Sequence, residues 1–439
     1  MVSGEVRPDN TEASADGFCA PAATAMTRRV PGSIAIIGGG IIGYACALRL
    51  LAAGHAVTLL DDDADGLAPS WGNAGHIATE QVVPLASLAM VRSAPQRLFA
   101  FGGALDLRQP WRLGGWLARY LAACAPARHR RGHAALRALL ADALPAWRGF
   151  VDDLGAPELL REAGHIVCWG TPEAARRGEA AWRGSDIGSA GIQTLDPDMS
   201  DCLTQALAKA PAGGIGFVRT AQIDDPRRLR QQVRQRFVEQ GGVLHPQRVQ
   251  ALRTRSGQAH LLLEQGEQLA ADQVLVCAGV RSAALMTSLG IRAPLVAERG
   301  YHLEWRHHDW PKMLPPVVFE DRSVILTRFS EGLRLAGFVE YAPVETPPDP
   351  RKWHALQRHA DALGLPVHGE PMRWHGARPT LPDYLPAIGR SRTVPQVCYA
   401  FGHQHLGLTL APVTALAVEA LIDEKTPPVS LAAFDLARF

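Results

Sequence analysis

The segment that most constrains the fold of this chain is the glycine-rich run Gly38-Gly39-Gly40-Ile41-Ile42-Gly43. It follows residues 33–37, a short apolar and β-branched run that is typical of a strand buried on both faces of a parallel sheet. Small and apolar residues then predict a helix over 41–53, which Gly54 ends, and residues 56–60 predict a second strand. These elements form a β-α-β unit with a glycine-rich turn, the arrangement that binds a dinucleotide.

The spacing of three glycines and one aspartate indicates how such a ligand is held. Gly38 permits the tight turn, Gly40 lets a pyrophosphate approach the backbone, and Gly43 lets the helix touch the strand. Asp61 stands 18 residues beyond Gly43, at the end of the second predicted strand, where its carboxylate can accept hydrogen bonds from a ribose. The same negative charge would repel the 2′-phosphate of NADP, so this motif leaves FAD and NAD as the candidates.

Length and composition set the class of protein. The chain has 439 residues, 47% hydrophobic and 20% charged, so it can bury the cores of two or three domains. Its 45 basic and 43 acidic side chains leave a formal charge of +2, without the basic excess of a nucleic-acid-binding protein. The seven cysteines occur singly with no C-x-x-C pair, so we predict neither a redox dithiol nor a zinc site, and no other metal.

Two features of the chain bear on its location. No run reaches the roughly 18 uninterrupted apolar residues of a membrane-spanning helix, and the first 30 residues lack the apolar core of a secretory signal, so we expect a cytoplasmic protein. Residues 1–31 are rich in Ala, Ser, Asp, Pro and Gly without periodicity and contain a second methionine, Met26. This segment predicts a disordered extension or an over-long gene start.

Residues 91–150 carry a charge that the whole-chain total hides. They contain ten arginines against Asp106 and Asp142, a local charge of +8. The helical spacing of Leu, Ala and Trp, as at Trp116 and Leu117, predicts amphipathic helices with an arginine-rich outer face. Three roles stay open for this face: a solvated surface, a peripheral contact with the inner face of a membrane, and a contact with a protein partner.

The rest of the pattern predicts a mixed α/β protein. Helical signals alternate with short apolar runs as far as Gly279, and the strand-like runs between residues 301 and 337 indicate an antiparallel sheet. The predicted helices are 226–240, 350–363 ending at Gly364, and 409–422, and the predicted strands are 243–244, 249–252, 259–263 and 272–279.

Three more segments contain glycine and small polar residues in motif-like runs. They are residues 70–76 (Ser-Trp-Gly-Asn-Ala-Gly-His), residues 376–389 (with Gly376-Ala377-Arg378-Pro379, Pro382-Asp383 and Ile388-Gly389) and residues 402–409 (Gly-His-Gln-His-Leu-Gly-Leu-Thr). Together with Gly38 to Asp61, and in this order, they resemble the D-amino acid oxidase superfamily of flavoproteins, most closely its D-amino acid dehydrogenase branch. The resemblance spans about residues 33–425 and implies FAD as the cofactor.

The resemblance also implies the fold. We expect the α/β class, with a Rossmann-like FAD-binding domain interleaved with an α+β substrate domain built on an antiparallel sheet. The expected FAD-binding domain comprises residues 32–84, 221–299 and 376–428, and the expected substrate domain comprises residues 85–220 and 300–375.

Carried over residue by residue, the resemblance implies a set of FAD contacts. The first motif would hold the pyrophosphate, Asp61 the ribose, and the segment from Ser70 the phosphates and the flavin edge. The start of the last helix would face the flavin pyrimidine, where its dipole stabilises reduced flavin. One departure is Asp62, which replaces a basic residue often found there and affects only minor contacts to adenosine. The expected FAD-binding residues are Gly38, Gly40, Ile41, Ile42, Gly43, Asp61, Ser70, Asn73, Ala74, Gly75, Val249, Ala278, Gly279, Gly407, Leu408 and Thr409.

Five residues are candidates for the substrate site. Arg378 is the expected anchor, because an arginine fork pairs two-point with a carboxylate. Tyr301 would face the substrate, with a core aromatic as the alternative, and His76 would lie near the flavin ring. His403 and His405 flank the last glycine turn, where either can touch substrate or only pack and hydrogen-bond locally.

The resemblance implies an enzyme that oxidises a D-configured or cyclic secondary amino acid by passing a hydride from Cα to flavin N5. Residues 75–81 and the two histidines beside Gln404 are similar to D-hydroxyproline dehydrogenases, which implies cis-4-hydroxy-D-proline as a substrate. The alternatives are a glycine- or sarcosine-type oxidase and the flavin subunit of a multi-subunit amino acid dehydrogenase with an electron-acceptor partner. A module acting on modified RNA is disfavoured by the missing basic footprint.

Overall fold

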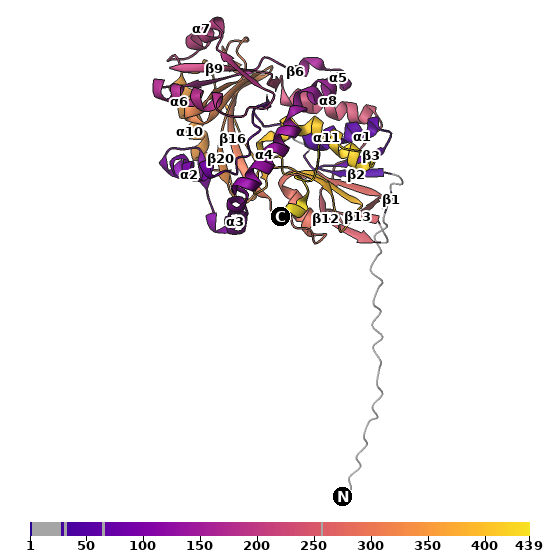
Figure 1. The fold of residues 1–439 in the computed structure, drawn as a ribbon. Coiled ribbons are helices and arrows are strands. Elements are labelled where there is room, and N and C mark those ends of the chain that lie inside the picture. Colours follow the sequence, from indigo (N-terminus) through magenta and orange to yellow (C-terminus); the bar gives the residue numbers. More distant parts are fainter. Residues whose placement is uncertain (2–27, 30–32, 64–65, 256–257) are drawn as a thin grey trace.

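The computed structural model describes Met1, residues 28–29, 33–63, 66–255 and 258–439 (Figure 1). The disorder predicted for residues 1–31 falls on a segment that, apart from Met1, Arg28 and Arg29, lies outside the described residues.

The glycine-rich run lies in the predicted β-α-β unit. Strands β2 (Ser33–Ile37) and β3 (Ala56–Leu60) pair in parallel, and helix α1 (Ile41–Ala52) connects them. Gly38 has φ +108°, a conformation that L side chains rarely adopt. A Cβ on Gly43 would lie 1.9 Å from the carbonyl oxygen of Gly38, so only glycine lets α1 approach the turn this closely.

This unit is the centre of a six-stranded sheet assembled from distant parts of the chain. Strand β2 is flanked by β3 and β15, and β15 pairs in parallel with β24, which carries an antiparallel edge strand, β23. Buried apolar side chains of α1, α8 (Pro226–Glu239) and α11 (Gly407–Ile422) belong to one core cluster beside this sheet. The sheet order is β11 (Val243–His245), β3, β2, β15 (Gln273–Val276), β24 (Val397–Phe401) and β23 (Ala387–Arg390).

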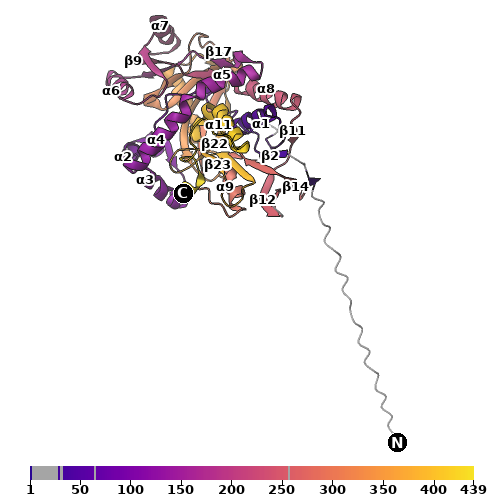
Figure 2. The same cartoon turned by 45° about the vertical axis from the view of Figure 1, so that its right-hand side comes forward.

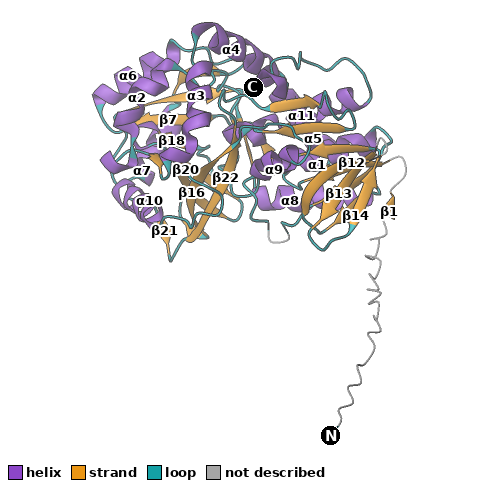
Figure 3. Ribbon diagram, turned by 90° about the horizontal axis from the view of Figure 1, so that it is seen from below, coloured by secondary structure: helices purple, strands orange, loops and turns teal. Residues whose placement is uncertain are grey.

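A second, nine-stranded sheet occupies the other half of the molecule, as Figure 3 shows for β16, β20 and β22. Its long central strand, β16, pairs antiparallel with both β20 and β22, which confirms the antiparallel sheet predicted after residue 301. The strand order is β22 (Met372–Thr380), β16 (Val296–Trp305), β20 (Gly332–Tyr341), β19 (Val324–Phe329), β18 (Val317–Phe319), β7 (His165–Trp169), β9 (Gly213–Val218) and β8 (Gly191–Thr194), with β5 (Leu105–Leu107) beside β20.

The mixture of parallel and antiparallel sheets confirms the predicted α/β class. Helix α10 (Pro350–Leu363) ends at Gly364, as predicted, with that glycine at φ +63°. Strands β16 and β22 extend a few residues across the expected domain boundaries, which stay a prediction. A four-stranded sheet has the order β1 (Arg28–Arg29), β14 (Gln268–Ala271), β13 (Gln258–Leu263) and β12 (Val249–Arg255). A three-stranded sheet has the order β4 (His76–Ile77), β10 (Ala221–Ile223) and β6 (Leu160–Arg161), and β17 (His307–His308) pairs with β21 (Val367–His368). Further helices are α6 (Pro172–Arg183), α7 (Pro197–Ala206) and α9 (Ser282–Thr287).

The arginine-rich region is helical, as predicted, but its outer face differs from the expectation. Helix α4 (Pro126–Ala141) does expose a row of arginines. Helix α3 (Gly114–Ala123) instead exposes small and apolar residues, and its one arginine, Arg119, is half-buried and donates to the carbonyl oxygen of Gly115. The remaining helices here are α2 (Leu88–Arg97) and α5 (Ala143–Asp153).

One helix of the described chain, Gln404–Ile422, is long and apolar enough to cross a membrane by composition alone. Most of it is buried inside the fold, against α1 and α5, so it packs as a core helix.

Candidate functional site

A cavity of about 880 Å³ lies at the carboxyl ends of β2, β3 and β15. Its wall includes Gly38 after β2, Asp61 after β3 and Ala278 after β15, and it continues to β16, β20 and β22 of the other sheet. Ligands of parallel α/β sheets bind at this edge, where successive strands end.

The cavity gathers nearly every residue expected in the site. All of the predicted residues line it except Gly43, which packs behind the turn, and Thr409. The hydroxyl of Thr409 instead accepts a hydrogen bond, 2.9 Å long, from the backbone N–H of Ala78 in the adjacent loop.

The motif end of the cavity fits a dinucleotide. Helix α1 starts at Gly40 without a side-chain cap and has no acidic residue in its first turn, so its N-terminus suits a phosphate. The hydroxyl of Ser70 accepts the N–H of Ile41 at 3.0 Å and lines the cavity beside the start of α1. Burial raises the pKa of Asp61, and a hydrogen bond from the backbone of Gly39 opposes that rise. These groups match the pyrophosphate and ribose of FAD.

The turn after Ser70 is held by internal hydrogen bonds. The amide of Asn73 donates to the carbonyl oxygen of Ser70 and accepts the N–H of Gly75, each at 2.7 Å. Arg334, itself paired with Glu304, donates to the carbonyl oxygen of Asn73 from the next sheet. The turn therefore presents its outer residues to the cavity in a fixed conformation.

Helix α11 brings a second N-terminus to the cavity. Gly407 and Leu408 line the wall, and the preceding Leu406 provides no side-chain cap. The indole N–H of Trp147 donates to the carbonyl oxygen of Leu408 at 3.0 Å and helps to anchor this end. The N–H groups of the first turn, which no helical carbonyl accepts, can face a negatively charged ligand edge, as expected for the pyrimidine of reduced flavin.

Arg378 lies on β22 opposite Glu298 of β16, and its Nη1 donates to Oε1 of Glu298 at 3.3 Å. Its side chain is 27% exposed, so the guanidinium is still open to a ligand. Gly300 makes the space for it, because a Cβ there would lie 2.3 Å from Nη2 of Arg378. The buried carboxylate of Glu298 also accepts hydrogen bonds from Thr380 at 3.0 Å and Tyr384 at 3.2 Å, and is thus fixed before substrate arrives.

Tyr301 lines the cavity with its ring, but its hydroxyl is held by the protein interior. It donates to Oε1 of Glu340 at 2.9 Å and accepts the N–H of Asp349 and an N–H of Arg299, both at 3.1 Å. These contacts favour the core-aromatic alternative, since the hydroxyl has no capacity left for a substrate.

The two histidines of the last glycine turn differ in their surroundings. Nε2 of His403 lies 3.1 Å from the hydroxyl of Thr414, and burial lowers its pKa to about 3. Nε2 of His405 lies 2.6 Å from Oε1 of Gln81. Burial lowers the pKa of His405 to about 4, with smaller effects from Glu298, which opposes the shift, and Arg378, which adds to it. Both imidazoles are therefore neutral at pH 7, and His405 is close enough to Arg378 to sense its charge.

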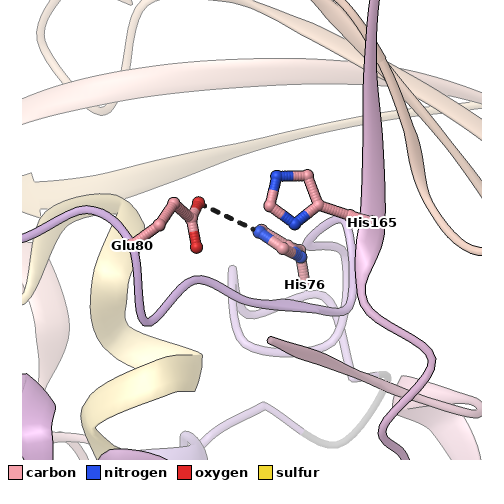
Figure 4. Close-up of side chains that lie close together, drawn as sticks. All are labelled: His76, Glu80 and His165. Atoms are coloured by element: carbon pink, nitrogen blue, oxygen red, sulfur yellow. Dashed lines mark hydrogen bonds and ion pairs between the residues drawn. The ribbon is translucent and has the colours of Figure 1, made fainter. Parts of the chain in front are cut away.

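His76 belongs to a buried cluster whose other members the sequence does not reveal (Figure 4). Its Nε2 lies 3.2 Å from Oε1 of Glu80, and its ring is 4.5 Å from the ring of His165, centroid to centroid. Burial alone would raise the pKa of Glu80, but His76 and His165 lower it to about 2. Burial lowers the pKa of His165 to about 3. The four-residue spacing of His76 and Glu80 is a weak signal, and nothing in the sequence connects either to His165.

Potential metal ligands occur together in two places within the described residues. One ligand atom from each of His76, Glu80 and His165 lies within 4.8 Å of the others. Asp106, Glu340 and Asp349 form the second group, but the ammonium of Lys352 lies 2.6 to 3.1 Å from all three carboxylates. Lys352 already supplies the positive charge there.

Comparisons with known proteins agree with this geometry. Residues 33–421 match the DAO family model, described as FAD dependent oxidoreductase. The chain is 30% identical over 420 residues to a D-amino-acid oxidase of Bradyrhizobium diazoefficiens, covering 92% of this chain and 98% of that protein. It is 28% identical to D-amino acid dehydrogenase 2 of Pseudomonas aeruginosa, covering 90% and 96%.

The fold is also that of a solved flavoenzyme. Glycine oxidase from Geobacillus kaustophilus superposes with a TM-score of 0.71 at 21% identity, over 94% of this chain and all of that one. The resemblance to the D-amino acid oxidase superfamily and the FAD cofactor that it implied are thereby confirmed, which decides between the FAD and NAD left open by the glycine motif. The chain belongs to the DAO family of FAD-dependent oxidoreductases.

Proposed function

We propose that this enzyme dehydrogenates a small amino acid of D configuration or with a cyclic secondary amine, such as cis-4-hydroxy-D-proline. The observation that carries the proposal is that one cavity contains both the dinucleotide motif and Arg378. A carboxylate held by Arg378 lies in the same enclosure as the cofactor site, as oxidation at the adjacent Cα requires.

The protein's part in this reaction is binding and orientation. Arg378 binds the substrate carboxylate, and Glu298 orients the guanidinium by accepting a hydrogen bond from its Nη1. His405 stays neutral through burial, so it adds no second positive charge beside Arg378, and the carboxylate is directed to the guanidinium.

When bound, FAD supplies the two-electron acceptor, with N5 taking the hydride that leaves Cα. The substrate nitrogen gives up a proton, and the carbon–nitrogen bond becomes an imine. An acyclic imine hydrolyses to a 2-oxo acid and ammonia, whereas a proline analogue remains a cyclic pyrroline carboxylate.

The test is an anaerobic titration of the FAD-loaded protein, followed by the flavin absorbance. We expect bleaching by cis-4-hydroxy-D-proline or D-alanine. Bleaching by sarcosine or glycine alone would replace the proposal with the glycine- and sarcosine-type oxidase. No bleaching by any amino acid would refute amino acid oxidation altogether.

We further propose that the enzyme is cytoplasmic and passes its electrons to a separate acceptor, either oxygen or a membrane quinone pool. Adding oxygen or a quinone analogue to the reduced protein, and timing the return of the flavin absorbance, distinguishes the two. Reoxidation by neither, but by an added partner protein, would favour the flavin-subunit alternative.

A further inference from the structure

Helix α3 turns a face of small and apolar residues to solvent. Its exposed residues recur at helical spacing and are Gly114, Gly115, Ala118, Leu121 and Ala122. The one charge on this helix is the half-buried Arg119, whose guanidinium donates to the carbonyl oxygen of Gly115. The opposite side of α3 packs on the rest of the fold: the buried Trp116 stacks on Tyr120 and packs against Tyr341 and Tyr384. The outward face is therefore not needed for the core of this chain.

Large apolar side chains extend this surface. Trp111, in the turn just before α3, is 76% exposed, and Leu121 on α3 is 53% exposed. Phe101, just after α2, is 77% exposed. Figures 1 and 2 both place α2 and α3 next to each other at the edge of the molecule. Two aromatic rings this exposed beside an apolar helix face are typical of an interaction surface.

Arginines flank the face at both ends. Arg112 precedes α3, and Arg128, Arg130 and Arg131 follow it at the start of α4, all exposed. Among the described residues the structure shows no ion pair to any of these four, whereas farther along the chain Arg137 pairs with Asp186 and Arg148 with Glu162. The charges beside α3 are thus available to an anionic partner.

We infer that the outer face of α3, with Trp111 and the flanking arginines, docks on the surface of an anionic phospholipid bilayer. Apolar side chains enter the headgroup boundary, tryptophan prefers that interface, and arginines extend to lipid phosphates. A second copy of the chain is a poorer occupant, since a two-fold contact through this face would set its arginines against their equivalents.

Docking here connects the membrane to the functional site. The hydroxyl of Tyr120 on α3 donates to the carbonyl oxygen of Leu85 at 3.1 Å, and Leu85 lines the cavity together with Arg97 of α2. The wall of the cavity at Leu85 therefore faces the lipid side in the docked enzyme. The inference does not depend on which amino acid the enzyme oxidises.

The test is sedimentation of the FAD-loaded full chain with vesicles of phosphatidylglycerol and phosphatidylcholine, or of phosphatidylcholine alone. We expect binding to the anionic vesicles only. Trp111→Ser with Leu121→Ser should reduce partitioning at least tenfold. Arg128→Gln, Arg130→Gln and Arg131→Gln should each reduce it about fivefold, the effect of one basic residue near an anionic surface.

Matched substitutions control for general effects. Val238→Ser on α8 removes an equally exposed apolar side chain, and Arg176→Gln with Arg177→Gln on α6 removes exposed charges elsewhere; both should bind vesicles like the unaltered protein. Flavin content and Tm identify any variant that has lost its fold. Vesicle binding that is absent, or equal in all variants, would overturn the inference. So would concentration-dependent dimers in sedimentation velocity that Trp111→Ser with Leu121→Ser abolishes.

Discussion

The guanidinium of Arg378 and the carboxylate of Glu298 meet across two paired strands, with Nη1 and Oε1 3.3 Å apart. The side chain of Glu298 is buried, whereas that of Arg378 is partly exposed. An incoming carboxylate therefore binds an arginine that is already oriented.

Replacing Arg378 with Met should weaken substrate binding by about 10- to 100-fold, since a hydrogen bond to a charged group contributes about 1.5–3 kcal/mol. The substrate Kd from anaerobic flavin titration measures the effect. The same titration on Arg378→Lys separates the effect of the positive charge from that of the two-point guanidinium geometry. The lysine variant should bind substrate more tightly than Arg378→Met but less tightly than the unaltered protein. Unchanged Kd and flavin reduction in Arg378→Met would exclude the carboxylate-anchor role.

Glu298→Gln keeps the shape of the side chain but removes the charge that orients Arg378. We expect flavin reduction at saturating substrate to slow about tenfold, because small displacements of a positioning group are costly in rate. The Kd should change less, since the substrate no longer shares the guanidinium with a carboxylate. Tyr384→Phe is the control, because it keeps the charge of Glu298 and removes one of its hydrogen bonds, together with the hydrogen bond that Tyr384 shares with Tyr341. A Kd loss as large as that of Arg378→Met would contradict a positioning role.

Gly43→Ala should abolish FAD binding and destabilise the fold by about 3 kcal/mol, because the new Cβ would sit 1.9 Å from the carbonyl oxygen of Gly38. The matched substitution is Gly149→Ala within α5, where no atom lies within 4 Å of the added Cβ. That change should be neutral or slightly stabilising. Flavin content and urea unfolding report both outcomes.

The buried, neutral His403 should make the free energy of unfolding fall at acid pH. Its pKa falls from 6.5 in the unfolded chain to about 3 in the fold, so between these values the unfolded state binds one more proton. The stability due to the neutral imidazole is complete above pH 6.5 and is lost as the pH falls toward 3, by up to about 1.4 kcal/mol per pH unit. His403→Asn should reduce the slope of unfolding free energy against pH by up to this amount in urea unfolding between pH 7 and 4.5, while His165 and His405 still contribute. Parallel curves for the two proteins would contradict the assignment.

Lys352 is fully buried among Asp106, Glu340 and Asp349. Lys352→Met leaves three carboxylates without their shared cation and should cost about 3–5 kcal/mol of unfolding free energy. The exposed Lys425, replaced in the same way, should change stability little. Denaturant midpoints compare the two; similar values would show that the buried network is dispensable.

Local patterns allowed the cofactor half of the site to be predicted. The turn of Gly38 to Gly43, the strand that precedes Asp61 and the helix that precedes Gly364 each depend on neighbours within a few residues. Their backbone conformations leave a signature in short stretches of sequence.

The substrate half was less predictable, because its contacts form between residues far apart in the chain. Glu298 and Arg378 are 80 residues apart in the sequence and meet through strand pairing. His76 and His165 are 89 residues apart, and their rings are in contact. For α3 the periodicity identified the covered face, where Trp116 is buried and Leu117 and Tyr120 are half-buried. Its outward face is not arginine-rich, because the exposed arginines of residues 91–150 lie before α3 and on α4 and α5.

The order in which the chain supplies the strands of the six-stranded sheet affects how the enzyme matures. The neighbours β2, β15 and β24 come from residues 33–37, 273–276 and 397–401, and helix α11 closes the cavity last. During synthesis from the N-terminus, the glycine turn emerges long before the strands that enclose it. We therefore expect stable flavin binding only after β24 and α11 have been made, and a chain that ends before residue 407 should purify without flavin.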